Sequence, residues 1–174
     1  MNQQKNLIMD IIQSRRSIRR FSDKKISKDV IKQVLNAGRW APSGLNNQPW
    51  RFLVVMEGDE EKPKLAECTK YSYIIEGAKA LIVVFLDKES VYHTVKDCQA
   101  IGACIQNMLL VIHSMGLGGV WLGEILNQSE KVCHILHVDS ERYDLMAVVA
   151  LGYPAEKGTS SRKELKDLML KSFD

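Results

Sequence analysis

The segment from Ser14 to Phe21 gathers side chains that bind anions. It carries four arginines and two serines within eight residues, including Arg15, Arg16, Ser17 and Arg19. A guanidinium makes forked, charge-assisted hydrogen bonds to phosphate, and a serine hydroxyl adds a short donor. The apolar residues interleaved with them indicate that one side of the segment packs inward. The segment therefore favours a phosphate monoester as ligand, and the alternative is a solvated basic surface.

A second polar stretch lies between residues 41 and 49 and runs into Trp50 and an apolar strand. It combines hydroxyl and amide side chains with residues that favour turns: Pro42, Ser43, Gly44, Asn46, Asn47, Gln48 and Pro49. Proline, glycine and asparagine favour tight turns, and the amides bring donors and acceptors into one short space. Such a loop suits a planar ligand edged with carbonyls and ring nitrogens. The alternative is a well-capped connection between a helix and a strand.

A third candidate is the glycine-rich segment from Gly116 to Gly123, which contains Leu122. A Rossmann fingerprint would need these glycines between a strand and the helix it feeds, whereas here they follow a helix. The dinucleotide interpretation is therefore rejected. Backbone amides freed by glycine can still approach a ligand closely, and ordinary turn chemistry is the alternative.

Other catalytic motifs are absent from the sequence. It contains no zinc-protease, P-loop or α/β-hydrolase motif, and no nucleophile and base can be paired. Cys133, His134 and His137 are close enough in sequence to suggest a metal site, but a fourth ligand is not evident, so no metal is expected. His113 is expected to interact with the end of a helix. An enzyme with such a site would need a cofactor to supply the reactive atom.

The positive charge is concentrated near the start of the chain. Residues 1–40 hold ten Lys or Arg against three acids, a charge of +7, whereas the whole chain is +3 and residues 41–174 therefore sum to −4. Such a local excess favours an anionic ligand and is too local for long nucleic acid. A nucleic-acid-binding role, the non-enzymatic alternative, would also need basic charge elsewhere, stacking aromatic motifs or a helix-turn-helix pattern.

Length and composition indicate one soluble globular domain spanning residues 1–174. The chain is long enough to bury a core, with 45% hydrophobic and 26% charged residues. The longest apolar runs have the length of strands, and the first residues lack the apolar core of a signal peptide, so a cytoplasmic protein without membrane contact is expected. The four scattered cysteines predict free thiols.

Hydrophobic periodicity predicts the elements that carry these segments. Three strong strands are expected at residues 52–56, 80–86 and 145–151, the second covered on both faces. Helices are expected near residues 7–13, 27–38, 64–68, 96–115 and 129–136. Ser27 is the predicted N-cap of the second helix and Gly38 its stop. A last helix is expected to bury Leu165, Leu168 and Met169. This pattern fits a layered α+β or α/β domain.

Three segments together resemble the FMN-dependent nitroreductase family: residues 15–21, residues 42–50, and residues 116–123 with Arg162 downstream. The resemblance spans nearly the whole chain in the family's order. It implies a three-layer α+β fold with a central, mostly antiparallel sheet flanked by helices. It further implies an intertwined homodimer with two FMN molecules at the interface, each contacted by both subunits.

The resemblance also implies a role for individual residues of this chain. Arg15, Ser17 and Arg162 would hold the phosphate, Arg16 would meet the flavin through backbone and ribityl contacts, and Arg19 would lie beside the pyrimidine edge. The partner subunit would supply residues of the asparagine-bearing loop: Pro42, Ser43, Gly44, Asn46 and Gln48. Leu122 and Gly123 would approach the redox nitrogen through backbone groups.

The implied reaction is hydride transfer from NADH or NADPH to FMN, followed by reduction of a nitroaromatic, quinone or related acceptor, with ping-pong kinetics. Arg19 would stabilise the negative charge of the reduced ring. The alternative within the fold is another flavin reaction: reductive dehalogenation, enone reduction or flavin fragmentation. Two departures bear on this choice. Few residues separate Phe52 from Ala80, and Ser160 stands where some members carry a second basic phosphate ligand.

Overall fold

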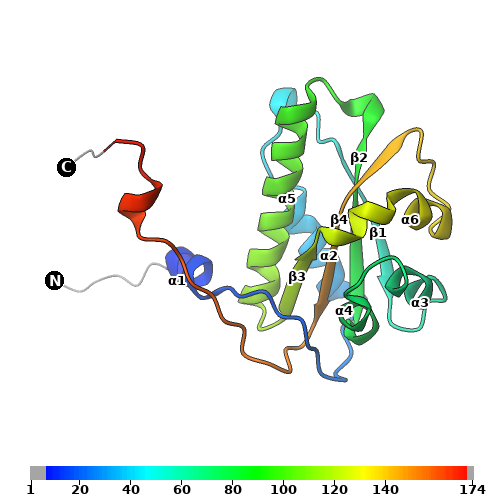
Figure 1. The fold of residues 1–174 in the computed structure, drawn as a ribbon, viewed down its shortest axis with the longest axis horizontal. Coiled ribbons are helices and arrows are strands. Elements are labelled where there is room, and N and C mark those ends of the chain that lie inside the picture. Colours follow the sequence, from blue (N-terminus) through cyan, green and yellow to red (C-terminus); the bar gives the residue numbers. More distant parts are fainter. Residues whose placement is uncertain (1–6, 172–174) are drawn as a thin grey trace.

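A four-stranded antiparallel sheet forms the middle of the molecule in the computed structural model, which describes residues 7–171. The strands are β1 (Trp50–Met56), β2 (Ala80–Asp87), β3 (Gly118–Leu122) and β4 (Tyr143–Gly152), in the order β1-β2-β4-β3. Every neighbouring pair is antiparallel. Helices cover both faces, as Figure 1 shows. The predicted three-layer α+β fold with an antiparallel sheet is therefore confirmed.

The two hydrophobic cores lie on opposite faces of this sheet. One contains side chains of α2 (Lys28–Gly38) and α5 (Thr94–Ser114) together with Ile82 and Val84 of β2. The other contains side chains of α3 (Glu61–Ala66), α4 (Ser72–Gly77) and α6 (Ser129–Ile135) together with Leu81 and Val83. All eight residues of β2 are buried, which confirms the predicted central strand.

The helices with clear periodicity form where the sequence predicts them. Ser27 Oγ accepts a hydrogen bond from the Val30 amide at 3.3 Å and caps α2, which ends at Gly38. The predicted stripe of α5 is buried against the sheet: Ile101, Cys104, Ile105, Met108, Leu109 and Ile112. By length and composition α5 could cross a membrane, but this buried stripe makes it a core helix. Helix α1 (Leu7–Ser14) buries none of its residues.

Two elements were missed or misassigned by the sequence prediction. The glycine-rich segment is not only a turn: after Gly116, at φ 72°, residues Gly118–Leu122 form the edge strand β3. Glycine is needed at residue 118, because a Cβ there would lie 2.7 Å from the Cβ of Ile18. Helix α4 was also missed, because no helix is predicted between residues 68 and 96, although Ile74 and Ile75 anchor it in the core.

The predicted last helix was wrong. Residues Leu165–Leu168 make a single 3-10 turn, η4, and the side chains of Leu165 and Leu168 are 66% and 60% exposed. Figure 1 shows that this segment and α1 both extend away from the sheet. The described part of the chain has three further 3-10 turns: η1 (Gly44–Asn46), η2 (Lys88–Ser90) and η3 (Glu124–Gln128). The apolar side chains of the two extensions are therefore not buried by the described chain.

Candidate functional site

The two ends of the described chain bring arginines together. Burial lowers the pKa of Arg15, and the positive charges of Arg162 and Arg16 lower it further, so these guanidiniums lie close enough to repel one another. Between residues 7 and 171, no carboxylate is within ion-pair distance of these three arginines, whereas Arg51 and Arg142 both pair with buried Asp87. Such a like-charged cluster would be stabilised by a bound anion.

Arg16 and Arg162 also make local hydrogen bonds. Arg16 Nη1 donates to the carbonyls of Gln13 at 2.6 Å and Arg15 at 2.9 Å, so this side chain satisfies backbone acceptors at the end of α1. Arg162 Nη1 donates to Ser160 Oγ and, at 2.7 Å, to the carbonyl of Ser161. The side chain of Arg16 thus supports the backbone at the end of α1.

His113 borders this arginine cluster. Its Nε2 lies 2.8 Å from Ser14 Oγ, which joins the C-terminal end of α5 to the end of α1. Burial lowers the pKa of His113, and the charges of Arg15 and Arg16 lower it further. The sequence placed His113 at a helix end, but it gave no sign that the arginine segment packs there.

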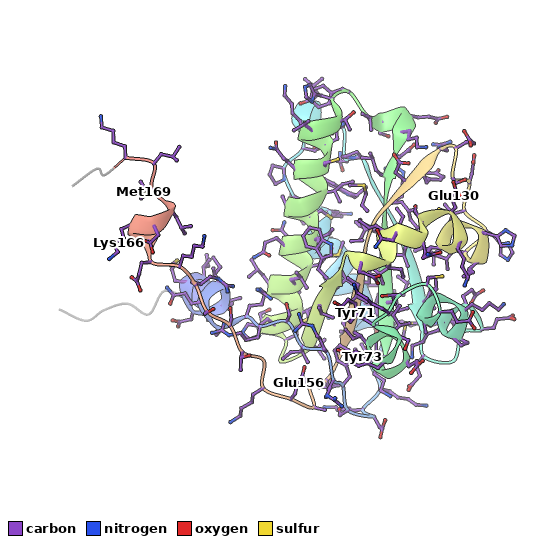
Figure 2. The ribbon with its side chains drawn as sticks, viewed as in Figure 1. Tyr71, Tyr73, Glu130, Glu156, Lys166 and Met169 are labelled. Carbon is purple, nitrogen blue, oxygen red and sulfur yellow. The ribbon has the colours of Figure 1, made fainter. Side chains whose placement is uncertain are left out.

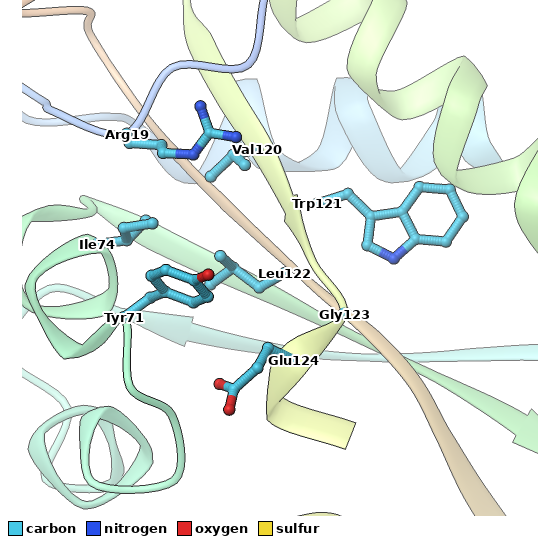
Figure 3. A pocket seen from close by; sticks show the side chains of 8 residues that line it. All are labelled: Arg19, Tyr71, Ile74, Val120, Trp121, Leu122, Gly123 and Glu124. Atoms are coloured by element: carbon cyan, nitrogen blue, oxygen red, sulfur yellow. The ribbon is translucent and has the colours of Figure 1, made fainter. Parts of the chain in front are cut away.

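Arg19 lies beside the edge strand, at a pocket of about 160 Å³. The lining residues come from the N-terminal segment, from α4 and the connection before it, and from β3 and the start of η3: Arg19, Tyr71, Ile74, Val120, Trp121, Leu122, Gly123 and Glu124. In Figure 3 the ring of Tyr71 stands between Ile74 and Leu122, with the Arg19 guanidinium above it. Arg19, Leu122 and Gly123 therefore border one pocket.

Arg19 also lines a second hollow of about 180 Å³, together with Ser17, Arg20 and Tyr73. Its remaining walls come from the segment that leads toward Arg162: Glu156, Lys157, Gly158 and Thr159. Figure 2 shows Tyr71, Tyr73 and Glu156 along the same side of the molecule. Ser17 and Arg19 therefore both border this second hollow, and Arg19 also borders the pocket at Gly123.

Glu124 holds the wall of the first pocket in place. Its Oε2 accepts hydrogen bonds from Thr69 Oγ1 at 2.5 Å and from the Lys70 amide at 3.2 Å, next to Tyr71. The hydrogen bond from Thr69 is the largest influence on the pKa of Glu124, which is lowered. Sequence motifs do not identify Tyr71 or Glu124, because only the packing of the α3–α4 connection against η3 brings them to the pocket.

The asparagine-bearing loop has an unusual backbone. Leu45, Asn46 and Gln48 have φ angles of 54°, 55° and 47°, in the left-handed region that non-glycine residues seldom adopt. Asn47 Nδ2 donates to Asp97 Oδ1 at 2.7 Å and to the carbonyl of Ser90 at 2.9 Å. The loop is therefore held in a costly conformation, as is common where a backbone is shaped for a ligand.

This loop does not reach the Arg19 pocket of its own chain. Pro42, Ser43 and Gly44 line a separate pocket of about 240 Å³ against α5, completed by Lys96, Gln99, Ala100 and Ala103. Asn46 is exposed, and its carbonyl accepts a hydrogen bond from Gln48 Nε2 at 3.2 Å. The expected site residues thus fall into two sets on one chain, an arginine and edge-strand set and a loop set.

The described residues do not gather a metal site. In the range 7–171 no group of three His, Cys, Asp or Glu side chains could hold a metal ion. All four cysteines are free, as predicted, and burial raises the pKa of Cys104 to about 12. Burial thus disfavours the thiolate form of Cys104.

Fold and site together define an α+β protein with a cluster of arginines at the two ends of the described chain and a pocket at its edge strand. A model of the nitroreductase family matches residues 12–70 and 64–153, and the chain belongs to the nitroreductase family. A relative from Archaeoglobus fulgidus, provisionally named NADH dehydrogenase/NAD(P)H nitroreductase, is 37% identical over 154 residues, which are 86% of each chain.

Solved structures agree with this assignment. A provisionally named nitroreductase from Desulfovibrio desulfuricans, solved in complex with FMN, is 48% identical, with a TM-score of 0.95 over 97% of this chain and 98% of that one. A provisionally named NADH oxidase from Clostridium acetobutylicum is 32% identical, with a TM-score of 0.83 over 94% of this chain and all of that one. The fold of this chain is thus the nitroreductase fold.

Proposed function

We propose that residues 1–174 form one nitroreductase-like domain, a cytoplasmic flavoprotein that transfers hydride from NADH or NADPH through FMN to nitroaromatic, quinone or related acceptors. The observation that carries this proposal is a cluster of arginines, Arg15 and Arg162, that pairs with no carboxylate among residues 7–171, on a chain that also has a pocket bordered by Arg19 and Gly123. FMN combines a phosphate with a planar polar ring, which matches these two features. The FMN complex of the 48% identical relative supports the choice.

The phosphate would be held by Arg15, Ser17 and Arg162. The two guanidiniums lie close enough to lower the pKa of Arg15, and a phosphate between them would replace repulsion by charge-assisted hydrogen bonds. The hydroxyl of Ser17 lies on the segment that bridges Gly119 of β3, so its position is fixed by the sheet. Arg16 would contribute mainly through its backbone, since its guanidinium donates to the carbonyls of Gln13 and Arg15.

The ring would lie against Arg19, Leu122 and Gly123. When bound, FMN supplies the chemistry of accepting and donating a hydride. Arg19 is exposed, and no carboxylate between residues 7 and 171 pairs with it, so its charge is available to the pyrimidine side of the ring. There it would stabilise negative charge in a site from which bound ligands exclude water. Gly123, without a side chain, leaves its backbone open to the ring.

A second copy of the chain would complete the site. The loop set around Ser43 lines a pocket that is separate from Arg19, so the loop of the partner would have to cover the ring. The apolar side chains of α1 and of the C-terminal segment support such a homodimer, because they are exposed in one chain: Leu7, Ile8, Ile12, Leu165, Leu168 and Leu170. Burying them against a partner would remove apolar area from water.

One pocket borders both Arg19 and Gly123, so donor and acceptor would use it in turn, and ping-pong kinetics are expected.

The test is the visible spectrum of the purified protein, followed by anaerobic addition of NADH or NADPH. Flavin absorbance that bleaches with one of them and returns on adding a quinone or nitroarene supports the proposal. A colourless protein that takes up no added FMN contradicts it. If only a halogenated aromatic or an enone restores the flavin absorbance, the reaction is instead reductive dehalogenation or enone reduction.

A further inference from the structure

Glu156 makes an unusual contact beside the arginine segment. Its Oε1 accepts hydrogen bonds from two consecutive backbone amides, those of Arg19 at 2.7 Å and Arg20 at 3.2 Å. We infer that Glu156 is a positioning residue that sets where the Arg19 guanidinium stands against the flavin. The inference rests on the proposed function, because it concerns the electrostatics of the same site.

The backbone around Glu156 explains why a side chain is needed there. Two segments run antiparallel: Phe21 bridges Pro154, the Ser22 amide donates to the Tyr153 carbonyl at 2.8 Å, and the Ala155 amide donates to the Arg20 carbonyl at 2.9 Å. Beyond Ala155 the chain turns toward Arg162. The carboxylate of Glu156 then takes the place of a backbone carbonyl and continues the connection to the amides of residues 19 and 20.

The other side of the arginine segment is fixed by the sheet. The Ile18 amide donates to the Gly119 carbonyl at 3.1 Å, next to the bridge between Ser17 and Gly119. Gly158 lies so close that an added Cβ would be 2.5 Å from the Cβ of Arg16 and 3.1 Å from the Ser17 carbonyl oxygen. The backbone of residue 19 is therefore held between the edge strand and the segment of Glu156.

The contact also leaves the charge of Arg19 free. A carboxylate among several arginines would be expected to pair with a guanidinium and reduce its effect on a ligand. Here the carboxylate binds amides, and in the part of the chain that the structure describes no ion pair joins Glu156 to an arginine. Hydrogen bonds from amides to a carboxylate are charge-assisted and stronger than neutral ones. Glu156 thus orders the segment without neutralising Arg19.

The test compares Glu156→Asp, Glu156→Gln and Glu156→Ala, with Glu130→Ala as a control that removes an exposed carboxylate on α6, far from the site in Figure 2. Aspartate keeps the charge but is too short to reach both amides, whereas glutamine keeps the reach and loses the charge. We expect Glu156→Asp, which keeps the charge, to lower the reduction potential of bound FMN, and both Glu156→Asp and Glu156→Ala to weaken FMN binding about tenfold, the effect of one lost hydrogen bond. Glu156→Gln should stay within about threefold of the parent in binding.

A cycle with Arg19→Ala separates positioning from general structural damage. If Glu156 acts through Arg19, Glu156→Asp should leave the potential unchanged once Arg19 is alanine. A parent potential in Glu156→Asp, or a shift that persists without Arg19, would overturn the inference. Because aspartate is a mild change, the reduction potential of the Glu156→Asp protein can be measured even if Glu156→Ala fails to fold. A parent protein that binds no FMN would instead refute the proposed function.

Discussion

Replacing Asp97 by asparagine would test how the asparagine-bearing loop is held. Asp97 is fully buried in the first turn of α5 and accepts three hydrogen bonds, from Asn47 Nδ2 at 2.7 Å, the His93 amide at 2.9 Å and the Tyr92 amide at 3.1 Å. Burial is the largest single influence and would raise its pKa, but the hydrogen bonds from His93, Asn47 and Tyr92 together lower the pKa of this carboxyl. The group is therefore ionised in the folded protein at neutral pH.

The size of the effect follows from these contacts. The substituted side chain, an amide, would keep one acceptor oxygen and place an NH₂ group against a donor. A flip of the Asn47 amide could relieve that clash, but it would break the bond of Asn47 to the Ser90 carbonyl, at 2.9 Å. One charge-assisted hydrogen bond is lost and one buried donor is left unpaired, so we expect a loss of about 2–4 kcal/mol in the free energy of unfolding. For a chain of this length that is a fall of roughly 4–16 °C in Tm.

The assay is thermal unfolding at one protein concentration, at neutral pH and at acidic pH. Because the pKa of Asp97 is lower in the folded than in the unfolded state, its stabilisation is present above the unfolded value of about 3.9 and is lost as pH falls through the folded value. The difference in Tm between parent and Asp97→Asn should therefore shrink in acid. Asp29→Asn, at an exposed ion pair with Lys32, is the control and should change Tm little. An Asp97→Asn protein that melts with the parent at neutral pH would refute this reasoning.

Two further substitutions test the loop and the arginine cluster. Gly44→Ala should weaken FMN binding in a titration followed by flavin fluorescence, because its Cβ would overlap Tyr92 Oη, whereas Gly77→Ala, with open space around its Cβ, should bind as the parent does. Arg15→Ala should raise the pKa of His113 in an NMR titration, since burial and then the charge of Arg15 hold it down; an unchanged value would mean that the two do not interact.

The central parts of the fold could be predicted because local chemistry determines them. The unbroken apolar run of β2, the long stripe of α5 and the Ser27 cap of α2 each need only the residues themselves and a core to pack on. The edge strand β3 could not be predicted as easily. Its glycines look like turn residues, and they form a strand because the Ile18 segment packs against them.

The candidate site, like the fold, could be predicted from the sequence only in part. The arginine segment and the asparagine-bearing loop could be proposed as site segments from residue types and spacing, and in the structure the charge of Arg162 acts on Arg15. Tyr71, Glu124 and Glu156 could not be found in this way, because each reaches the site only through tertiary contacts between distant segments. The C-terminal segment was wrongly predicted to be a helix that buries its apolar residues, since the sequence does not say which chain would cover them.

The most direct test of the account compares the dissociation constants of FMN and riboflavin, which differ only in the phosphate, for the parent, Arg15→Ala and Arg162→Ala proteins. The arginines are predicted to bind the phosphate, so each variant should weaken FMN binding by about tenfold or more, the worth of one charge-assisted hydrogen bond. Riboflavin binding should stay at the parent value. Equal weakening of both flavins, or parent affinity for FMN in both variants, would contradict the claim that the two ends of the chain converge on one phosphate.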